Sequence, residues 1–294
     1  MFCLGTVSLE RIFEMVICDT HSHYDDEAFD ADRDELLGCV LPAAGVEFVV
    51  NMGASMEGAE ASVRLAGKYR EEAGGFSGTT VYAGCGIHPD DTGVFEGKET
   101  ASGMKYADGA AVMQHLRELS GRKGVVCIGE IGLDYHWMVE PKKVQQRWFR
   151  EQMCLAHELQ LPINVHSRDA AQDTYDLIRE NYDAGRYTGG IIHCYSGSAE
   201  LAREYVKMGY QIGIGGVVTF KNAKTLKKVV AETPVEYLVT ETDCPYLSPE
   251  PYRGKRNDSR NIRFIVEMIA QLKGIDLEMC AEQLLRNAHE VYRI

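Results

Sequence analysis

Eight short apolar runs, separated by helix-patterned stretches, are the feature that most constrains the fold of this 294-residue chain. The runs cover residues 16–18, 46–52, 81–85, 125–128, 162–165, 190–192, 210–214 and 237–239. Stretches such as 143–159 between them repeat apolar residues at roughly 3.6-residue spacing. Strands that alternate with helices indicate a parallel sheet with helical crossovers, and continuous apolarity indicates strands buried on both faces. Eight such units predict an α/β fold, a closed (β/α)8 TIM barrel.

The alternative to the barrel is an open doubly wound sheet, but the chain lacks the Gly-x-Gly-x-x-Gly turn of a dinucleotide site. No Pro/Ser-rich linker divides the sequence, so residues 15–294 are expected to form one domain. Residues 1–14 precede the first run and are expected to be an N-terminal appendage. No apolar run approaches the roughly 20 residues that a membrane helix needs, so no membrane association is expected.

The cysteine content indicates the redox compartment, and the net charge limits how the chain can bind nucleic acid. Nine cysteines without a Cys-x-x-Cys motif favour a reducing cytoplasm, and we expect Cys127, Cys194 and Cys244 to be small core residues. The net charge of −13 opposes a broad basic surface for nucleic acid, so a polyanionic substrate must be held locally. We expect a monomer or a small homo-oligomer.

Potential metal ligands stand at the ends of the apolar runs. In an extended strand residues i and i+2 point to the same side, so His21 and His23 aim two imidazoles at one point. Barrel active sites lie at the C-terminal ends of the strands, and closure makes the first and last strands neighbours. Six candidate ligands should then face one mouth: His21, His23, Glu130, His166, His193 and Asp243.

These residue types suit a binuclear hydrolytic centre. Two divalent ions about 3.5–4 Å apart need a bridging carboxylate, and Glu130 is the only candidate at the end of the middle strand. Imidazoles are neutral, directional ligands, while Asp243 adds negative charge and can accept a proton from bound water. Coordination lowers the pKa of that water from 15.7 to roughly 7. By ligand softness the set favours Zn, Mn, Co or Ni over Mg.

Six ordered motifs and one basic segment closely resemble the TatD family of metal-dependent deoxyribonucleases, within the amidohydrolase-like barrels. They are Asp19-Thr20-His21-Ser22-His23, Gly86-Ile87-His88-Pro89, Gly129-Glu130-Ile131-Gly132-Leu133-Asp134-Tyr135, Asn164-Val165-His166-Ser167-Arg168, His193-Cys194-Tyr195-Ser196-Gly197, Glu241-Thr242-Asp243-Cys244-Pro245-Tyr246-Leu247 and Arg253-Gly254-Lys255-Arg256-Asn257. The resemblance implies a two-metal hydrolase and allows Mg as the working ion. It assigns His21, His23, Glu130 and Asp243 to one ion, and Glu130, His166 and His193 to the other. One departure is Asp258-Ser259, where many relatives have Glu-Pro.

Other residues near the motifs are candidates for binding the substrate. Asp134 is expected to orient a ligand or substrate. The remaining candidates line the pocket or bond phosphate oxygens: His88, Ser167, Arg168, Ser196, Arg253, Lys255 and Arg256. The alternatives are a backbone-bonded His88, a salt-bridged Arg168 and a solvated basic loop. Residues 90–109 are expected to form a mobile loop over the mouth, with a surface insertion as the alternative.

The function these observations favour is phosphodiester hydrolysis at accessible single-stranded DNA or short oligonucleotide ends. An ester or amide hydrolase, such as an aminoacyl-tRNA deacylase, is the second reading, because a metal-activated water attacks carbonyl and phosphoryl centres alike. The third is a non-catalytic barrel that binds nucleic acid or a partner. The basic cluster favours a phosphate substrate, and the intact ligand set argues against loss of catalysis.

Overall fold

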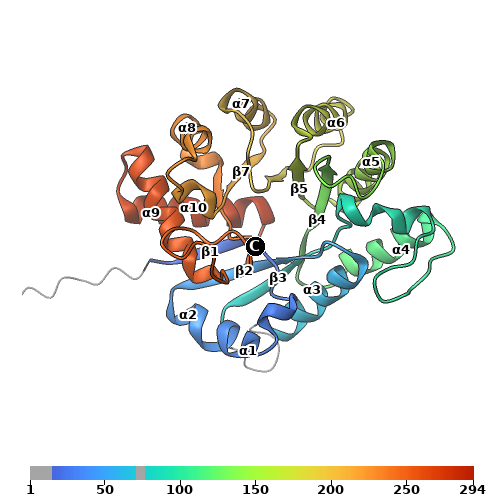
Figure 1. Cartoon of the computed structure of the whole chain (residues 1–294), viewed down its shortest axis with the longest axis horizontal. Helices are drawn as coiled ribbons and strands as arrows, with labels where there is room; N and C mark the ends of the chain where they lie inside the picture. The colour runs from blue at the N-terminus through green and yellow to red at the C-terminus, as the bar shows by residue number, and fades with distance from the viewer. Residues whose placement is uncertain (1–14, 71–76) are drawn as a thin grey trace, which may run out of the picture.

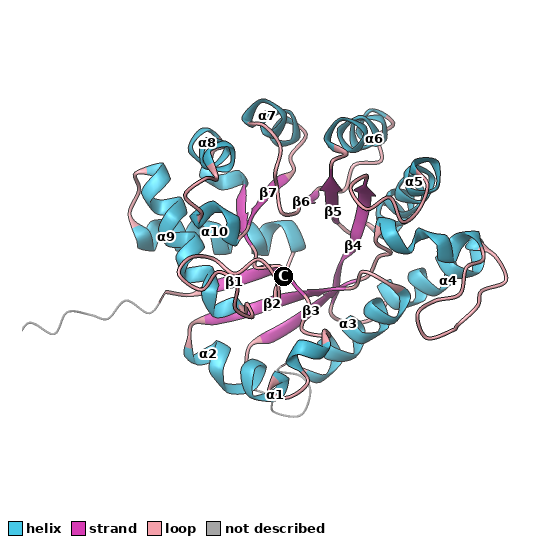
Figure 2. Ribbon diagram, viewed as in Figure 1, coloured by secondary structure: helices cyan, strands magenta, loops and turns pink. Residues whose placement is uncertain are grey.

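Eight parallel strands lie side by side in the order of the sequence and form a barrel wall (Figures 1 and 2). The computed structural model describes residues 15–70 and 77–294, so the appendage expected at residues 1–14 falls outside it. The strands are β1 (Ile17–Ser22), β2 (Val46–Met52), β3 (Thr80–Gly84), β4 (Val125–Asp134), β5 (Ile163–Arg168), β6 (Gly190–Ile192), β7 (Gln211–Ile214) and β8 (Leu238–Thr240). The predicted (β/α)8 barrel is confirmed.

Hydrogen bonds between the two ends of the sheet close the barrel. Thr20 Oγ1 donates to the carbonyl of Thr240 at 3.0 Å, and Thr240 Oγ1 donates to the carbonyl of Cys18 at 3.2 Å. Beyond the end of β8, the amide of Asp243 donates to the carbonyl of His21 at 2.9 Å. Closure therefore places the two most distant motifs of the sequence next to each other.

Helices surround the barrel as an outer layer (Figure 2). They are α1 (Arg33–Glu35), α2 (Leu41–Ala43), α3 (Met56–Lys68), α4 (Gly109–Ser120), α5 (Lys142–Leu159), α6 (Ala171–Asp183), α7 (Ala199–Lys207), α8 (Lys224–Glu232), α9 (Ile262–Lys273) and α10 (Leu277–Tyr292), with a π-turn at Leu36–Val40 and 3-10 turns at Glu27–Phe29, Pro89–Glu96, Gly216–Thr219, Val235–Tyr237 and Ser259–Asn261. Side-chain caps begin several of them; Ser55, for example, accepts from the amide of Gly58 at the start of α3. None of the described helices is long and apolar enough to span a bilayer.

Two apolar layers stabilise the barrel. One lies between the strands and the helices, and the other fills the interior, where Phe48, Met52 and Cys127 pack with Tyr292 of α10. Cys127 and Cys244 are buried, as expected. Cys194 differs, because it is only partly buried and lines a cavity beside β6.

Three strands run further than the apolar runs predicted. β1 continues through His21, β4 through Glu130 to Asp134, and β5 through His166 to Arg168. The sequence analysis placed these ligands at the ends of the apolar runs, and the strands extend beyond those runs to include them. Backbone pairing does not depend on the polarity of a side chain, so a strand continues where polar residues find partners inside the barrel.

Most of residues 90–109 do not lie over the mouth (Figure 1), although Asp90 and Asp91 line a hollow together with His88 and Glu130. The first of them form a 3-10 turn (Pro89–Glu96), and the remainder extends beside α4 at the edge of the molecule (Figure 1). Ser102 donates from its amide and its hydroxyl to Glu57 of α3, at 2.9 and 2.6 Å, and Lys98 pairs with Glu140 at 2.5 Å. These partners are distant in sequence, so the apolar pattern gave no sign of them.

Candidate metal centre

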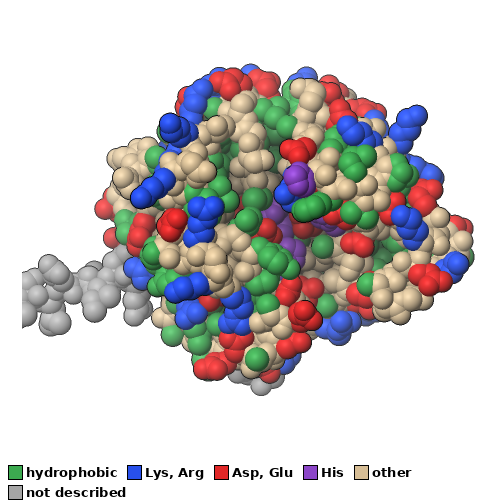
Figure 3. Space-filling model, viewed as in Figure 1, with side chains coloured by type: hydrophobic (Ala, Val, Ile, Leu, Met, Phe, Trp, Pro, Cys, Tyr) green, Lys and Arg blue, Asp and Glu red, His purple; other side chains and the backbone are tan. Residues whose placement is uncertain are grey.

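The predicted ligands converge at the centre of the face that carries the C-terminal strand ends, where histidine atoms gather in a hollow (Figure 3). His21 Nε2 lies 3.2 Å from Nε2 of His23 and 3.5 Å from Oε2 of Glu130. Asp243 Oδ1 lies 3.3 Å from His23 Nε2 and 3.8 Å from His21 Nε2. The ligand atoms of His21, His23 and Asp243 all lie within 4.8 Å of one another. This spacing fits the four residues expected to hold the first ion.

The second expected ligand set is also close together, and His88 joins it. His166 Nδ1 lies 2.9 Å from Oε1 of Glu130, and His193 Nε2 lies 3.9 Å from the same oxygen. The ring of His193 stacks on His21 with 3.4 Å between centroids. His88 joins Glu130 and His166 in a group whose ligand atoms lie within 4.8 Å of one another. His88, expected to line the pocket, is therefore also placed to bind an ion.

A glycine permits the close approach of β4 and β5 at this point. Gly132 has φ +148°, and a Cβ atom there would come within 2.0 Å of the carbonyl oxygen of His166. A residue with a side chain would push the strands apart. The Gly at this position of the Gly-Glu-Ile-Gly motif thus keeps Glu130 beside His166.

Two of the histidines have a hydrogen-bond acceptor at Nδ1, and a third has a carboxylate within ion-pair distance of Nδ1. His21 Nδ1 lies 2.9 Å from Oδ1 of Asn164, and His23 Nδ1 lies 3.0 Å from the carbonyl of Met52. His193 Nδ1 lies 3.0 Å from Oε2 of Glu241. An acceptor at Nδ1 favours the tautomer whose Nε2 lone pair is free for a metal.

The sequence predicts only some of the groups that lie at the Nδ1 atoms of these histidines. Glu241 stands two residues before Asp243, so strand alternation predicts that the two share a face, with a nearby Arg as the alternative partner; the structure pairs Glu241 with His193. Asn164 was missed, although it stands two residues before His166 and strand alternation could have found it. A backbone acceptor such as the Met52 carbonyl carries no signal in a sequence.

The charges in the centre fit a cation. Burial disfavours the imidazolium of His23, but Asp243 and Glu130 raise the pKa of His23 to about 9. Burial likewise opposes charge on His166, but Asp134 and Glu130 raise its pKa to about 9. Burial opposes ionisation of Glu130, yet His21 and His166 hold the pKa of Glu130 well below its usual value. The carboxylates therefore require positive charge beside them, which divalent ions supply.

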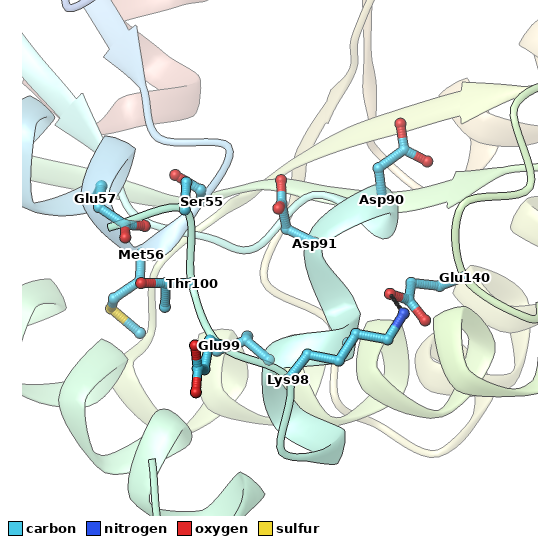
Figure 4. Close-up of a pocket in the computed structure, with 12 residues that line it drawn as sticks. Ser55, Met56, Glu57, Asp90, Asp91, Lys98, Glu99, Thr100 and Glu140 are labelled. Atoms are coloured by element: carbon cyan, nitrogen blue, oxygen red, sulfur yellow. Dashed lines mark hydrogen bonds and ion pairs between the residues drawn. The ribbon is translucent and has the colours of Figure 1, made fainter. Parts of the chain in front are cut away.

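An acidic hollow opens in front of the candidate ligands. It measures about 340 Å³ and is lined by His23, Asp25, Asp26, Ala54, His88, Asp90, Asp91, Glu130 and Tyr246. Asp90 and Asp91 also line a neighbouring pocket, in which Lys98 extends towards Glu140 (Figure 4). Burial and the nearby carboxylate of Asp90 raise the pKa of Asp91 to about 6. Without cations this hollow would repel a phosphodiester.

The other substrate-binding candidates lie in different surroundings. Asp134 Oδ2 lies 3.0 Å from His166 Nε2, which fits the expected orienting role. Ser167 and Ser196 line a second cavity of about 310 Å³ that reaches His193. Arg168 stands over the ring of Trp137 at 5.4 Å and, within the described residues, makes no hydrogen bond or ion pair through its side chain. A salt-bridged Arg168, the alternative reading, is thus not observed.

The basic segment does not contribute three free charges. Arg256 Nη2 lies 2.5 Å from Oδ2 of Asp32, so the charge of Arg256 is already balanced. Arg253 lies over the ring of Phe220 at 4.4 Å, and Lys255 lies over Tyr252 at 5.6 Å. No interaction in the described parts of the chain joins the three to the candidate ligands. The expectation that all three bind phosphate stays a prediction, and the ion pair with Asp32 makes Arg256 the least available of the three.

Asp258 and Ser259, which stand where many relatives have Glu-Pro, lie behind β1. Ser259 Oγ donates to Oδ2 of Asp19 at 2.6 Å, and the amide of Ser259 donates to Tyr24 Oη at 3.0 Å. A proline could make neither bond. Through Asp19, Ser259 therefore supports β1, which contains His21 and leads into His23. The observed bonds give Ser259 no direct place in holding a substrate end.

Comparisons with known proteins agree with this geometry. The family model described as TatD related DNase matches residues 18–293. The chain is 39% identical over 279 residues to the uncharacterized metal-dependent hydrolase YabD of Bacillus subtilis, covering 95% of this chain and 100% of that one. It is 31% identical over 277 residues to the uncharacterized metal-dependent hydrolase MJ1582 of Methanocaldococcus jannaschii, covering 94% and 96%. The crystal structure of YjjV, a TatD homologue from Escherichia coli K12, superposes with a TM-score of 0.80 at 27% identity, over 96% of this chain and 99% of that one.

Proposed function

Because the chain belongs to the TatD family of metal-dependent hydrolases, we propose that it cleaves phosphodiester bonds at accessible ends of single-stranded DNA. The observation that carries the proposal is the convergence of the ring nitrogens of His21 and His23 with the carboxylates of Glu130 and Asp243. A dense set of inward-facing nitrogen and oxygen donors matches the ligands that divalent metal ions take in proteins.

Two divalent ions at this centre would lower the pKa of a bound water and polarise the phosphoryl oxygen. Glu130 is placed to serve both ion sites, because Oε2 faces His21 while Oε1 faces His166. Asp243 has one oxygen within 3.8 Å of three imidazoles, so it is suited to accept the proton of the attacking water. The acceptors at Nδ1 hold the rings in place during this step.

The surroundings favour a phosphate substrate over a neutral ester. The hollow is so acidic that a phosphodiester can enter only when cations have reversed the local charge, which couples substrate binding to metal binding. Arg168 provides guanidinium donors free of protein partners among the described residues, and such donors match phosphate oxygens. Zn, Mn, Co, Ni or Mg are the ions we propose.

The test is a digest of end-labelled single-stranded DNA by protein stripped with a chelator. We expect no cleavage without metal, and cleavage restored to different extents by each ion, with products shortened one nucleotide at a time. Asp243→Asn is the matched control and should cleave at least a hundredfold more slowly while it still binds DNA. Full activity in demonstrably metal-free protein would overturn the proposal. So would hydrolysis of carboxylic esters, with DNA left intact, by the metal-loaded enzyme.

A further inference from the structure

An exposed apolar segment lies beside the centre, between β4 and α5. Trp137 is 62% exposed, Met138 is 43% exposed and Val139 is 56% exposed. Three large apolar side chains in a row at the surface are unusual, because soluble proteins keep such groups buried unless they contact something.

The backbone of this segment is held by a residue of the candidate site. The amides of His136 and Trp137 both donate to Oδ1 of Asp134, at 2.8 and 3.0 Å. The other oxygen of the same carboxylate lies 3.0 Å from Nε2 of His166. One buried carboxylate therefore fixes the position of Trp137 relative to a candidate metal ligand.

A positively charged side chain, Arg168, lies beside the indole ring of Trp137. The guanidinium of Arg168 lies 5.4 Å from the ring of Trp137, and the ring of His136 meets it edge-on at 4.7 Å. His136 is itself held by Asp169, whose Oδ2 lies 2.9 Å from Nδ1 of His136. Arg168 has no side-chain hydrogen bond or ion pair in the part of the chain that the structure describes. Much of the indole remains open to solvent beside an uncommitted positive charge.

We propose that Trp137 is the surface on which a base of the single-stranded substrate stacks, while Arg168 binds an adjoining phosphate; this rests on the proposed function. Bases and phosphates alternate along a strand, so an aromatic ring beside a guanidinium matches one nucleotide unit. Stacking needs no positive charge, which suits a chain with a net charge of −13. It also requires an unpaired base, and this selects single strands over duplexes.

Intrinsic fluorescence tests the contact directly, because the chain has two tryptophans. Trp148 is 5% exposed and stacks on Phe95 with 4.1 Å between centroids, so added DNA should not reach it. With cleavage blocked by Asp243→Asn, we expect oligo(dT) of eight nucleotides to quench the fluorescence saturably. The quenching should persist in the Trp148→Phe background and vanish in the Trp137→Phe background.

The affinity of Trp137 variants for oligonucleotides tests whether a base stacks on the Trp137 ring. By anisotropy, Trp137→Ala should bind the octanucleotide roughly tenfold or more weakly, and Trp137→Phe should recover most of the loss. The wild-type preference for this oligonucleotide over one of equal length that lacks bases should collapse in Trp137→Ala. Tyr182→Ala removes another exposed aromatic, 36% exposed, from α6 and is the matched control.

The outcomes separate this proposal from the proposed function. Unchanged affinity in Trp137→Ala, or equal wild-type affinity for the two oligonucleotides, would overturn stacking. So would a change of mass in sedimentation of Trp137→Ala, since the segment would then be a contact between copies of the chain. If wild-type protein binds DNA with quenching but cleaves none with any metal, the proposed function fails while the contact stands.

Discussion

Each of three histidines in the centre presents Nε2 inwards because an acceptor occupies Nδ1. For His193 this group is the buried carboxylate of Glu241, which lies 3.0 Å from Nδ1 as an ion pair and accepts a hydrogen bond from the amide of Cys194. The charge of Glu241, together with Asp243 and Glu130, raises the pKa of His193 against the effect of burial. Glu241 is therefore a positioning residue, because it acts on a ligand and not on the substrate.

Replacing Glu241 with Gln tests this role. The amide oxygen can keep the bond from Cys194, and then the amide nitrogen faces His193 Nδ1 as a donor. The proton of the ring would move to Nε2, which removes the lone pair that a metal needs. We expect the affinity for Zn or Mn, measured by titration calorimetry, to fall about 10–100-fold.

The control for this substitution is Glu282→Gln, on the exposed face of α10. It should bind metal like the wild type. Equal affinity in the Glu241 variant would show that the tautomer of His193 does not depend on this carboxylate.

At the scale of single elements, the first turn of α3 holds the segment that precedes α4. Burial opposes ionisation of Glu57, but hydrogen bonds from Ser102 and Thr100 lower the pKa of Glu57 from 4.5 to about 2. Because the folded value is the lower one, the ionised carboxylate stabilises the fold above about pH 4.5. This contribution is lost as the pH falls towards 2.

Glu57→Gln should therefore reduce stability at neutral pH and not in acid. We expect Tm at pH 7 to drop by roughly 1–3 °C, since the group is partly exposed, and the difference from wild type to shrink between pH 4.5 and pH 2. Thermal melts across this range provide the measurement, and Glu99→Gln in the same segment is the control. A difference that stays constant with pH would mean that the charge is not involved.

The strands and the loops differ in how well the sequence predicted them. The apolar runs predicted all eight strands because parallel strands buried on both faces need such runs, and alternation predicted the convergence of His21 and His23. The ion pair of Arg256 was not predicted because its partner, Asp32, belongs to an irregular segment whose course no periodicity encodes. Glu57 was missed for the same reason, since Ser102 lies in a loop.

At the scale of the whole molecule, charge limits how DNA can bind. With a net charge of −13 and Arg256 paired to Asp32, we expect only two or three phosphate contacts, from residues such as Arg168, Arg253 and Lys255. Log affinity should fall with log salt at a slope of roughly −1.5 to −2, at about −0.7 for each contact.

Anisotropy with short single-stranded DNA, in the Asp243→Asn background at a fixed level of divalent metal, measures this slope. Arg168→Ala should flatten it by about 0.7, whereas Arg256→Ala should change it less because Asp32 already neutralises that charge. A slope near −6 would instead indicate a broad basic groove.

The closure of the barrel also sets the order in which activity can arise during synthesis. Thr20 and Thr240, which join the first and last strands, are separated by 220 positions, and candidate ligands sit beside each. A nascent chain that has released β1 to β7 from the ribosome still lacks Asp243 and the final wall of the centre. Contacts between such distant segments form late, since they require loop closure across almost the entire chain. A chain that ends before Asp243 would therefore lack one candidate ligand, and the proposed hydrolysis requires both ends of the barrel wall.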